Sequence, residues 1–313
     1  IFKELQYLSN IDYKPIRYIS FAHDEETYKA LEASKAWSKA EMIAPKQFRE
    51  EISPYFNANP KKYISALVSE DCWQATPGKV VDLVRNLGIA AGGTVMEDCR
   101  VLEACREGKY TSVLVQTHDK KYVEYRTEHF VNALGSGAGK LCDSMGIDAG
   151  LYPVRHQAFI TRRLPMLGKH GTNLDMLIDR QDYKGFSAVY GQQIAYTGQI
   201  IGCASPKLDA MRIDKNLKVN TKAFLEIVSE MFSEWIPDLA GVGIQAVWAG
   251  YYTEPRYIVD PELGLFVGMC GHGFMLSQYI ARMYVDKLLG RPVPEYFEKL
   301  KLNGPGLSEK AFK

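Results

Sequence analysis

The sequence lacks the cysteine patterns that mark zinc sites and disulfide frameworks. Its six cysteines are scattered, no two form a CxxC pair, and none has a histidine at ligand spacing. We therefore expect no metal site and reduced, mainly structural thiols, which favours a cytoplasmic protein.

Excess charge and long apolar runs are also missing. There are 38 lysines and arginines against 37 aspartates and glutamates, so a net charge of +1 gives no general attraction for nucleic acid. No apolar run approaches the roughly 20 residues of a membrane span, and no charged-then-apolar leader precedes the fold. We expect no nucleic-acid partner and no membrane span.

Local patterns predict a globular α/β chain. Of 313 residues, 46% are hydrophobic and 24% charged, which is enough for two domains. Alternating or β-branched stretches predict strands at residues 14–22, 110–119, 121–135, 151–164, 186–191, 192–202 and 241–259. The strands at 110–119 and 121–135 are expected to form a hairpin.

Helices are predicted by acidic first turns, apolar spacing and flanking proline or glycine. They cover residues 23–45, 74–87, 220–237 and 274–290. The third helix carries an apolar stripe that we expect in the core: Phe224, Ile227, Val228, Met231 and Trp235.

A glycine-bracketed histidine, "CGHGFMLS" at residues 270–277, separates an apolar strand from the last helix. Such a junction places free backbone N–H groups and the positive helix end at one point, which suits an anion or a group that becomes anionic. A simple glycine turn with His272 at the surface is the alternative interpretation.

Three segments, in this order, resemble the D-amino-acid-oxidase-like class of FAD-dependent oxidoreductases, the group of glycine oxidase, sarcosine oxidase and dimethylglycine dehydrogenase. They are "VNALGSGAGKLCDSMGIDAGLYPVRHQ", "AVWAGYYTEPRYIV" and "GLFVGMCGHGFMLSQYIARMYVDKLLG". The family begins with a strand, a GxGxxG turn and a helix that holds the FAD pyrophosphate. No such fingerprint occurs here, and "GSGAGK" is a poor Walker loop. We expect the first βαβ unit to be missing before residue 1, either absent, outside these residues or on another polypeptide.

The resemblance implies that FAD is the cofactor. In the family, the turn at Gly271, His272 and Gly273 stabilises negative charge at the N1/C2=O edge of reduced flavin, and its glycines let the backbone approach. These three residues are the catalytic candidates, and Phe274 and Met275 would lie beside the flavin.

Further FAD contacts are implied elsewhere. Ala133, Gly135 and Ser136 resemble the loop that passes the pyrophosphate and ribose, unless they form only a strand-to-helix turn. Val101 lies where family members hold adenine with backbone atoms, although its side chain is equally suited to the core.

Family members place a substrate-binding cation where this chain has Tyr252 and Met275. Arg256 is the nearest replacement, and its planar fork suits a carboxylate, unless it pairs at the surface with an acidic neighbour. Tyr190, Tyr252 and Met275 complete the predicted substrate-binding residues.

The predicted architecture is an α/β (α+β) fold in which a Rossmann-like FAD-binding domain (67–150 and 253–313) is interleaved with an antiparallel-sheet substrate domain (11–66 and 151–252). The predicted function is FAD-dependent oxidation of the C–N bond of a small amine or N-substituted amino acid. Oxidation of a hydroxy acid or polyol, or a non-catalytic role in a flavoenzyme complex, are the alternatives, and the chain is compatible with homo- or hetero-oligomers.

Overall fold

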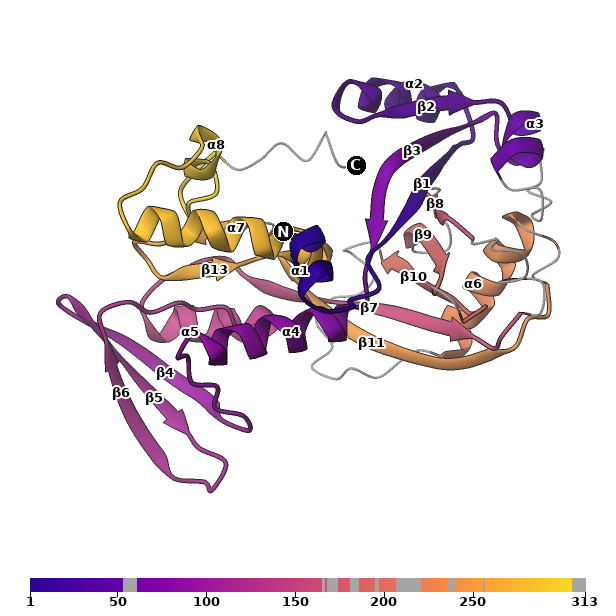
Figure 1. Ribbon diagram of the computed structural model, residues 1–313. Helices are drawn as coiled ribbons and strands as arrows, with labels where there is room; N and C mark the ends of the chain where they lie inside the picture. The colour runs from indigo at the N-terminus through magenta and orange to yellow at the C-terminus, as the bar shows by residue number, and fades with distance from the viewer. Residues whose placement is uncertain are drawn as a thin grey trace. The chain divides into compact units, whose positions relative to one another are not determined.

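The computed structural model describes residues 1–52, 61–164, 167, 174–180, 186–194, 197–206, 221–235, 237, 240–255 and 257–305 (Figure 1). The chain divides into two compact, interleaved units. The first comprises Ile1–Ile11, Pro77–Val154 and Tyr251–Lys313, and the second comprises Asp12–Thr76 and Arg155–Gly250. The mixed α/β class is confirmed.

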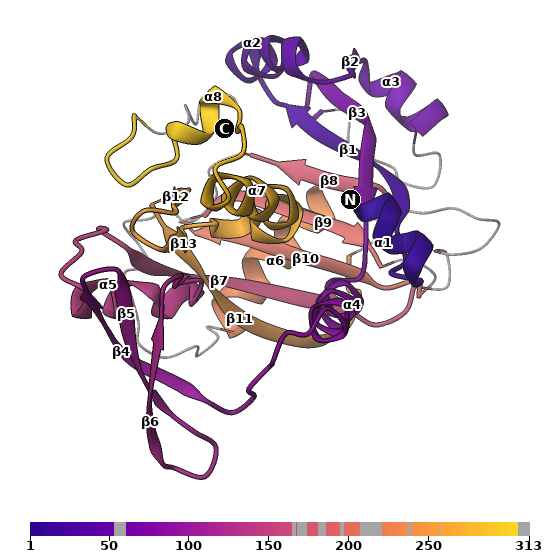
Figure 2. The same ribbon diagram turned by 60° about the vertical axis from the view of Figure 1, so that its left-hand side comes forward.

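Most of the second unit is an eight-stranded sheet with the order β11-β7-β10-β9-β8-β1-β3-β2 (Figure 2). Its strands are β1 (Lys14–Ala22), β2 (Ala40–Ile43), β3 (Ser65–Gln74), β7 (Tyr152–Thr161), β8 (Met176–Asp179), β9 (Phe186–Gln193), β10 (Ile200–Pro206) and β11 (Ile244–Glu254). The sheet is not purely antiparallel, because β1 pairs antiparallel with β3 and parallel with β8. The expected domain boundary at residue 67 falls inside β3, which pairs with β1 along its length, and the chain leaves this unit only after Thr76.

Helix α6 (Thr221–Trp235) covers one face of this sheet (Figure 2). Phe224, Ile227 and Val228 are buried in a core cluster with residues of β1, β7, β8, β9 and β10. This confirms the predicted core role of these three residues. The side chains of Met231 and Trp235 lie outside those that the structure describes.

The long helix predicted over residues 23–45 is wrong in its second half. Helix α2 (Glu25–Ser34) is capped by Asp24, whose Oδ1 accepts from the backbone N–H of Thr27 at 2.8 Å. The chain then passes through a 3₁₀ turn, Lys35–Trp37, into β2, which pairs with β3. Sheet pairing overrides the helical propensity of this stretch. The short helix α3 (Pro45–Gln47) and a π-helical turn, Phe48–Ile52, follow.

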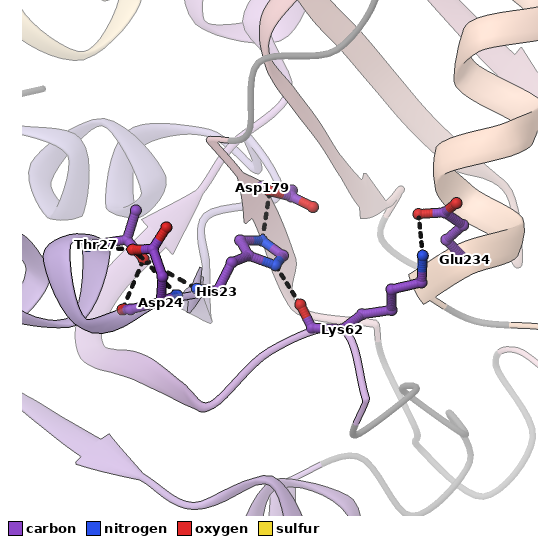
Figure 3. A network of polar contacts seen from close by, with 6 residues as sticks. All are labelled: His23, Asp24, Thr27, Lys62, Asp179 and Glu234. Atoms are coloured by element: carbon purple, nitrogen blue, oxygen red, sulfur yellow. Dashed lines mark hydrogen bonds and ion pairs between the residues drawn. The ribbon is translucent and has the colours of Figure 1, made fainter.

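A buried polar network joins the end of β1 to β8 (Figure 3). The Nε2 of His23 lies 2.7 Å from Oδ1 of Asp179, and their side chains are 8% and 3% exposed. His23 Nδ1 contacts the carbonyl oxygen of Lys62. Because both partners are acceptors, this arrangement requires both ring nitrogens to donate, as in the imidazolium. Burial opposes that charge, but the hydrogen bond to Asp179 and its charge outweigh burial and raise the pKa of His23.

The first unit contains a three-stranded sheet with the order β4-β5-β6. Strands β5 (Tyr110–Gln116) and β6 (Tyr122–Thr127) form the predicted hairpin, and β4 (Arg100–Glu107) pairs with β5. Helix α5 (Ala138–Ser144) packs on this sheet through Leu141. The strand predicted to continue through residue 135 ends at Thr127.

A second part of this unit consists of the β12 (Ile258–Asp260) and β13 (Leu265–Val267) hairpin with α7 (Gly273–Leu288) beside it (Figure 1). Val259, Ile280 and Tyr284 share a buried cluster with Phe297 of α8 (Glu295–Glu298). The N-terminal α1 (Phe2–Leu8) also belongs to this unit.

Helix α4 (Pro77–Ala90) buries only Val80. Val81, Leu87 and Ile89 are 62%, 40% and 43% exposed. A helix of this length usually derives its stability from packing an apolar face. Its apolar residues are therefore largely uncovered within the described part of the chain.

The described residues lack two further features. No helix there is both long and apolar enough to cross a membrane. The same residues contain no group of three or more His, Cys, Asp or Glu side chains that could hold a metal ion.

Candidate functional site

A parallel bridge in the first unit brings together the segments of the candidate site. Asn132 and Leu265 form a parallel bridge, in which Asn132 donates its N–H to Gly264 at 2.7 Å and accepts from Phe266 at 3.0 Å. The segments that follow, residues 133–138 and 268–273, therefore leave the bridge at the same edge. In open α/β sheets, ligands bind at the carboxyl ends of parallel strands.

The buried side chain of Asn132 shapes the first of these segments. Its Nδ2 donates to the Ala138 carbonyl oxygen at 3.0 Å, and its Oδ1 accepts from the Leu134 N–H at 3.3 Å. Gly135 has φ +54°, and a Cβ built on it meets no atom within 4 Å. The predicted FAD-contacting residues Ala133, Gly135 and Ser136 are all exposed, so the loop presents accessible backbone.

Val101 lies on β4, which is an edge strand of the three-stranded sheet. Its side chain is partly buried against the cluster around Ala104 and Val115. The side chain thus has a packing role, while the outer backbone edge of β4 has no strand partner in the described residues. Both interpretations of Val101 are compatible with this geometry.

The glycine-bracketed histidine forms a 3₁₀ turn, Cys270–His272, that leads into α7. His272 is the N-cap, and no side chain of the described residues caps this helix end. The His272 N–H itself donates to the Met269 carbonyl oxygen at 2.9 Å. The positive end of the dipole of this 16-residue helix therefore lies at a turn without a side-chain cap. The anion-stabilising role that the sequence predicts for this turn stays a prediction.

The two glycines of the turn have different roles. Gly273 has φ −54° and is the first residue of α7, so its backbone does not require glycine. A Cβ on Gly271 would lie 2.5 Å from Cε2 and 2.8 Å from Oη of Tyr252. Gly271 thus allows the Tyr252 ring to lie against the turn.

Two side chains near the end of β11 contact consecutive residues of this turn. Tyr252 lies against Gly271, and the Oε1 of Glu254 accepts a hydrogen bond from the Sγ of Cys270 at 2.9 Å. Glu254 and Cys270 were not among the site residues predicted from the sequence. The available signal was strand alternation, which puts residues 252 and 254 on one face.

The remaining predicted residues are distributed over both units. Phe274 packs against Phe2 of α1 with ring centroids 5.5 Å apart, and the rings of His272 and Tyr257 are 6.1 Å apart. Met275, in the first turn of α7, is 49% exposed. Arg256 lies outside the described residues.

Tyr190 lies on β9 of the second unit, opposite Cys203 of β10 in the strand register. Burial raises the pKa of the Cys203 thiol to about 11. Cys203 is therefore protonated near neutral pH, which disfavours reactivity as a nucleophile.

The fold is shared with solved flavoenzyme structures. An L-proline dehydrogenase from P. horikoshii matches with a TM-score of 0.77 and 22% identity, covering 96% of this chain and 79% of that one. A glycine oxidase from Geobacillus kaustophilus matches with a TM-score of 0.77 and 16% identity, covering 96% and 78%. An L-alpha-glycerophosphate oxidase from Mycoplasma pneumoniae with FAD bound matches with a TM-score of 0.71 and 14% identity, covering 92% and 78%.

Among curated protein sequences, none matches the chain. The sequence model of one protein family does match, over residues 1–287, and that family is described as FAD dependent oxidoreductase. This match covers most of the chain and includes both strand ends and the start of α7. The protein belongs to the family of FAD-dependent oxidoreductases.

Proposed function

We propose that the protein oxidises the C–N bond of a small amine or N-substituted amino acid. The observation that carries this proposal is the uncapped start of α7 beside Tyr252, at the edge where two parallel strands end. Two of the similar structures are an L-proline dehydrogenase and a glycine oxidase, which supports an amino-acid-like substrate.

Bound FAD would supply the acceptor for a hydride from the substrate α-carbon, so that the C–N bond becomes C=N. The chain supplies position and electrostatics. The Gly271 N–H and the positive end of α7, which begins at Gly273, would stabilise the negative charge that accompanies the electron pair. Tyr252 would confine the substrate on one side of the turn, and Met275 would add apolar surface.

The residues present fit part of FAD. The open backbone at Gly135 suits close approach of a phosphate or sugar, and the glycine turn at Gly271 suits the flavin edge. The sequence has no GxGxxG turn for the pyrophosphate. We propose that a βαβ segment outside these 313 residues, on the same or another polypeptide, supplies it. The uncovered apolar residues of α4 support this proposal, because such a segment would need a helix face to pack on.

The compartment and the domain assignment are proposals as well. All six cysteines are free thiols, which supports a reducing compartment such as the cytoplasm. The first unit would bind FAD, and the second unit, with Tyr190, would contribute to substrate binding.

The test is anaerobic mixing of the flavin-loaded protein with candidate substrates while flavin absorbance is followed. We expect secondary amino acids or amines to bleach the flavin, and glycerol phosphate and 2-hydroxy acids to leave it oxidised. Bleaching by a hydroxy compound alone would overturn C–N oxidation. It would favour the alternative chemistry, which the similarity to a glycerophosphate oxidase also supports.

Arg256→Met is expected to weaken binding of a carboxylate substrate by about 2–4 kcal/mol, because a buried carboxylate would lose its charge-assisted bidentate partner. The measurement is the apparent dissociation constant from the substrate dependence of flavin bleaching. Arg126→Met, on the exposed β6, is the matched control and should leave that constant unchanged. An unchanged constant in Arg256→Met would assign the carboxylate to another cation or indicate an uncharged amine.

A further inference from the structure

The turn before α7 continues the β12–β13 hairpin. Beyond the last pair of that ladder, Ile258 with Val267, the Tyr257 N–H donates to the Gly268 carbonyl oxygen at 2.8 Å. Gly268 has φ +69°, and a Cβ on it would collide with the Pro255 carbonyl oxygen. The two chain segments thus remain in contact up to the point where the turn begins.

Cys270, the first residue of the turn, has φ +48°. This left-handed conformation is uncommon and strained for a residue other than glycine. It persists only where surrounding contacts hold it. One contact at its side chain is the hydrogen bond from Sγ to Glu254 Oε1, at 2.9 Å and partly buried.

The neighbouring residue is held by the same strand. Tyr252 and Glu254 lie on one face of β11, because side chains alternate along a strand. Tyr252 lies against Gly271, and Glu254 holds Cys270. The end of β11 therefore determines where the turn, and with it the start of α7, is placed.

We propose that Glu254 and Cys270 are positioning residues, whose hydrogen bond fixes the Cys270–His272 turn so that the Gly271 N–H meets the flavin edge. This inference rests on the proposed use of that turn. Neither residue touches the reacting atoms. They act through the backbone of Gly271.

The first experiment tests the hydrogen bond without flavin. Purified protein is treated with iodoacetamide, and alkylation of Cys270 and of the exposed Cys105 is followed by peptide mass spectrometry. In Glu254→Ala, Cys270 should react about tenfold faster than in the wild type, whereas Cys105 should be unchanged. Equal rates for Cys270 in both proteins would overturn the proposal.

The second experiment tests the consequence for bound flavin. In Cys270→Ala, reductive titration with dithionite should show an about tenfold less favourable two-electron reduction, equivalent to about 30 mV. Cys270→Ser keeps a donor and should restore the wild-type potential, while Cys105→Ala is the matched control. Cys270→Gly also removes the hydrogen bond, but glycine adopts the positive φ without strain. A lowered potential in Cys270→Gly would therefore be caused by the loss of the hydrogen bond.

Failure of the positioning role can be distinguished from failure of the proposed substrate class, because dithionite titration needs no substrate. A wild-type potential in Cys270→Ala would overturn the positioning role, whatever substrates the protein oxidises. A lowered potential in a protein that fails to oxidise amines would support the positioning role and overturn the proposed substrate class. In stopped-flow bleaching with an amine, Cys270→Ala should lower the rate constant of reduction and leave the substrate dissociation constant unchanged.

Discussion

Gly271→Ala is expected to lower the rate constant of flavin reduction about 10²–10³-fold, the effect of losing one preorganised backbone donor at a site of developing charge. The added Cβ would lie 2.5 Å from the Tyr252 ring, so either the ring or the turn must move. Both are placed at the reacting edge in our proposal. Rapid-mixing bleaching with an amine, at saturating substrate, measures the change.

Gly273→Ala is the matched control. Gly273 has a helical φ of −54°, and its Cβ would meet only Met269 Cβ, at 3.3 Å. The flavin of Gly273→Ala should therefore be reduced at close to the wild-type rate. The double variant Gly271→Ala/Tyr252→Ala removes the obstructing ring, so its rate constant of flavin reduction should be higher than that of Gly271→Ala. If Gly271→Ala reduces normally, the start of α7 does not face the flavin.

Asp179→Ala is expected to lower the free energy of unfolding of the second unit by about 3–5 kcal/mol, because it leaves the His23 charge buried without its partner. Both side chains are almost fully buried. Urea unfolding measures the loss. Glu234→Gln, at an exposed ion pair with Lys62 3.4 Å long, is the control and should cost about 0–1 kcal/mol. Equal losses in the two variants would contradict the buried charge pair.

The same pair predicts a pH dependence. The pKa of His23 is raised above 6.5 in the folded protein. Its contribution is therefore fully present below about pH 6.5 and is lost as the pH rises through the raised pKa. Asp179→Asn keeps an acceptor oxygen without the charge, so its unfolding free energy should depend less on pH in this window. A wild-type slope in that variant would assign the dependence to other groups.

Local patterns in the sequence predicted the parts that depend on near neighbours. Strand β1 has the predicted bounds, Lys14–Ala22, because its β-branched and aromatic residues favour a strand regardless of partner. The prediction for residues 35–43 was wrong, since helical propensity there is overridden by pairing of β2 with β3.

The candidate site was likewise predictable only where its residues are neighbours in the sequence. The glycines around His272 could be identified from sequence, because a strand, a glycine turn and a helix follow one another directly. The Cys270–Glu254 hydrogen bond spans 16 residues and depends on how β11 meets the turn. The bridge between Asn132 and Leu265 joins segments still farther apart, and no local pattern specifies such a partner.

That bridge also has a consequence for the order of events during synthesis. The first unit is assembled from three separated segments, and its site needs both Asn132 and the stretch from Leu265 to α7. Contacts of such high sequence separation form late, since a long loop must close before they are gained. As the chain leaves the ribosome, the segment around Asn132 must wait for more than a hundred further residues. The flavin-binding edge is then among the last parts to be completed, and nascent chains that stop before α7 cannot contain it.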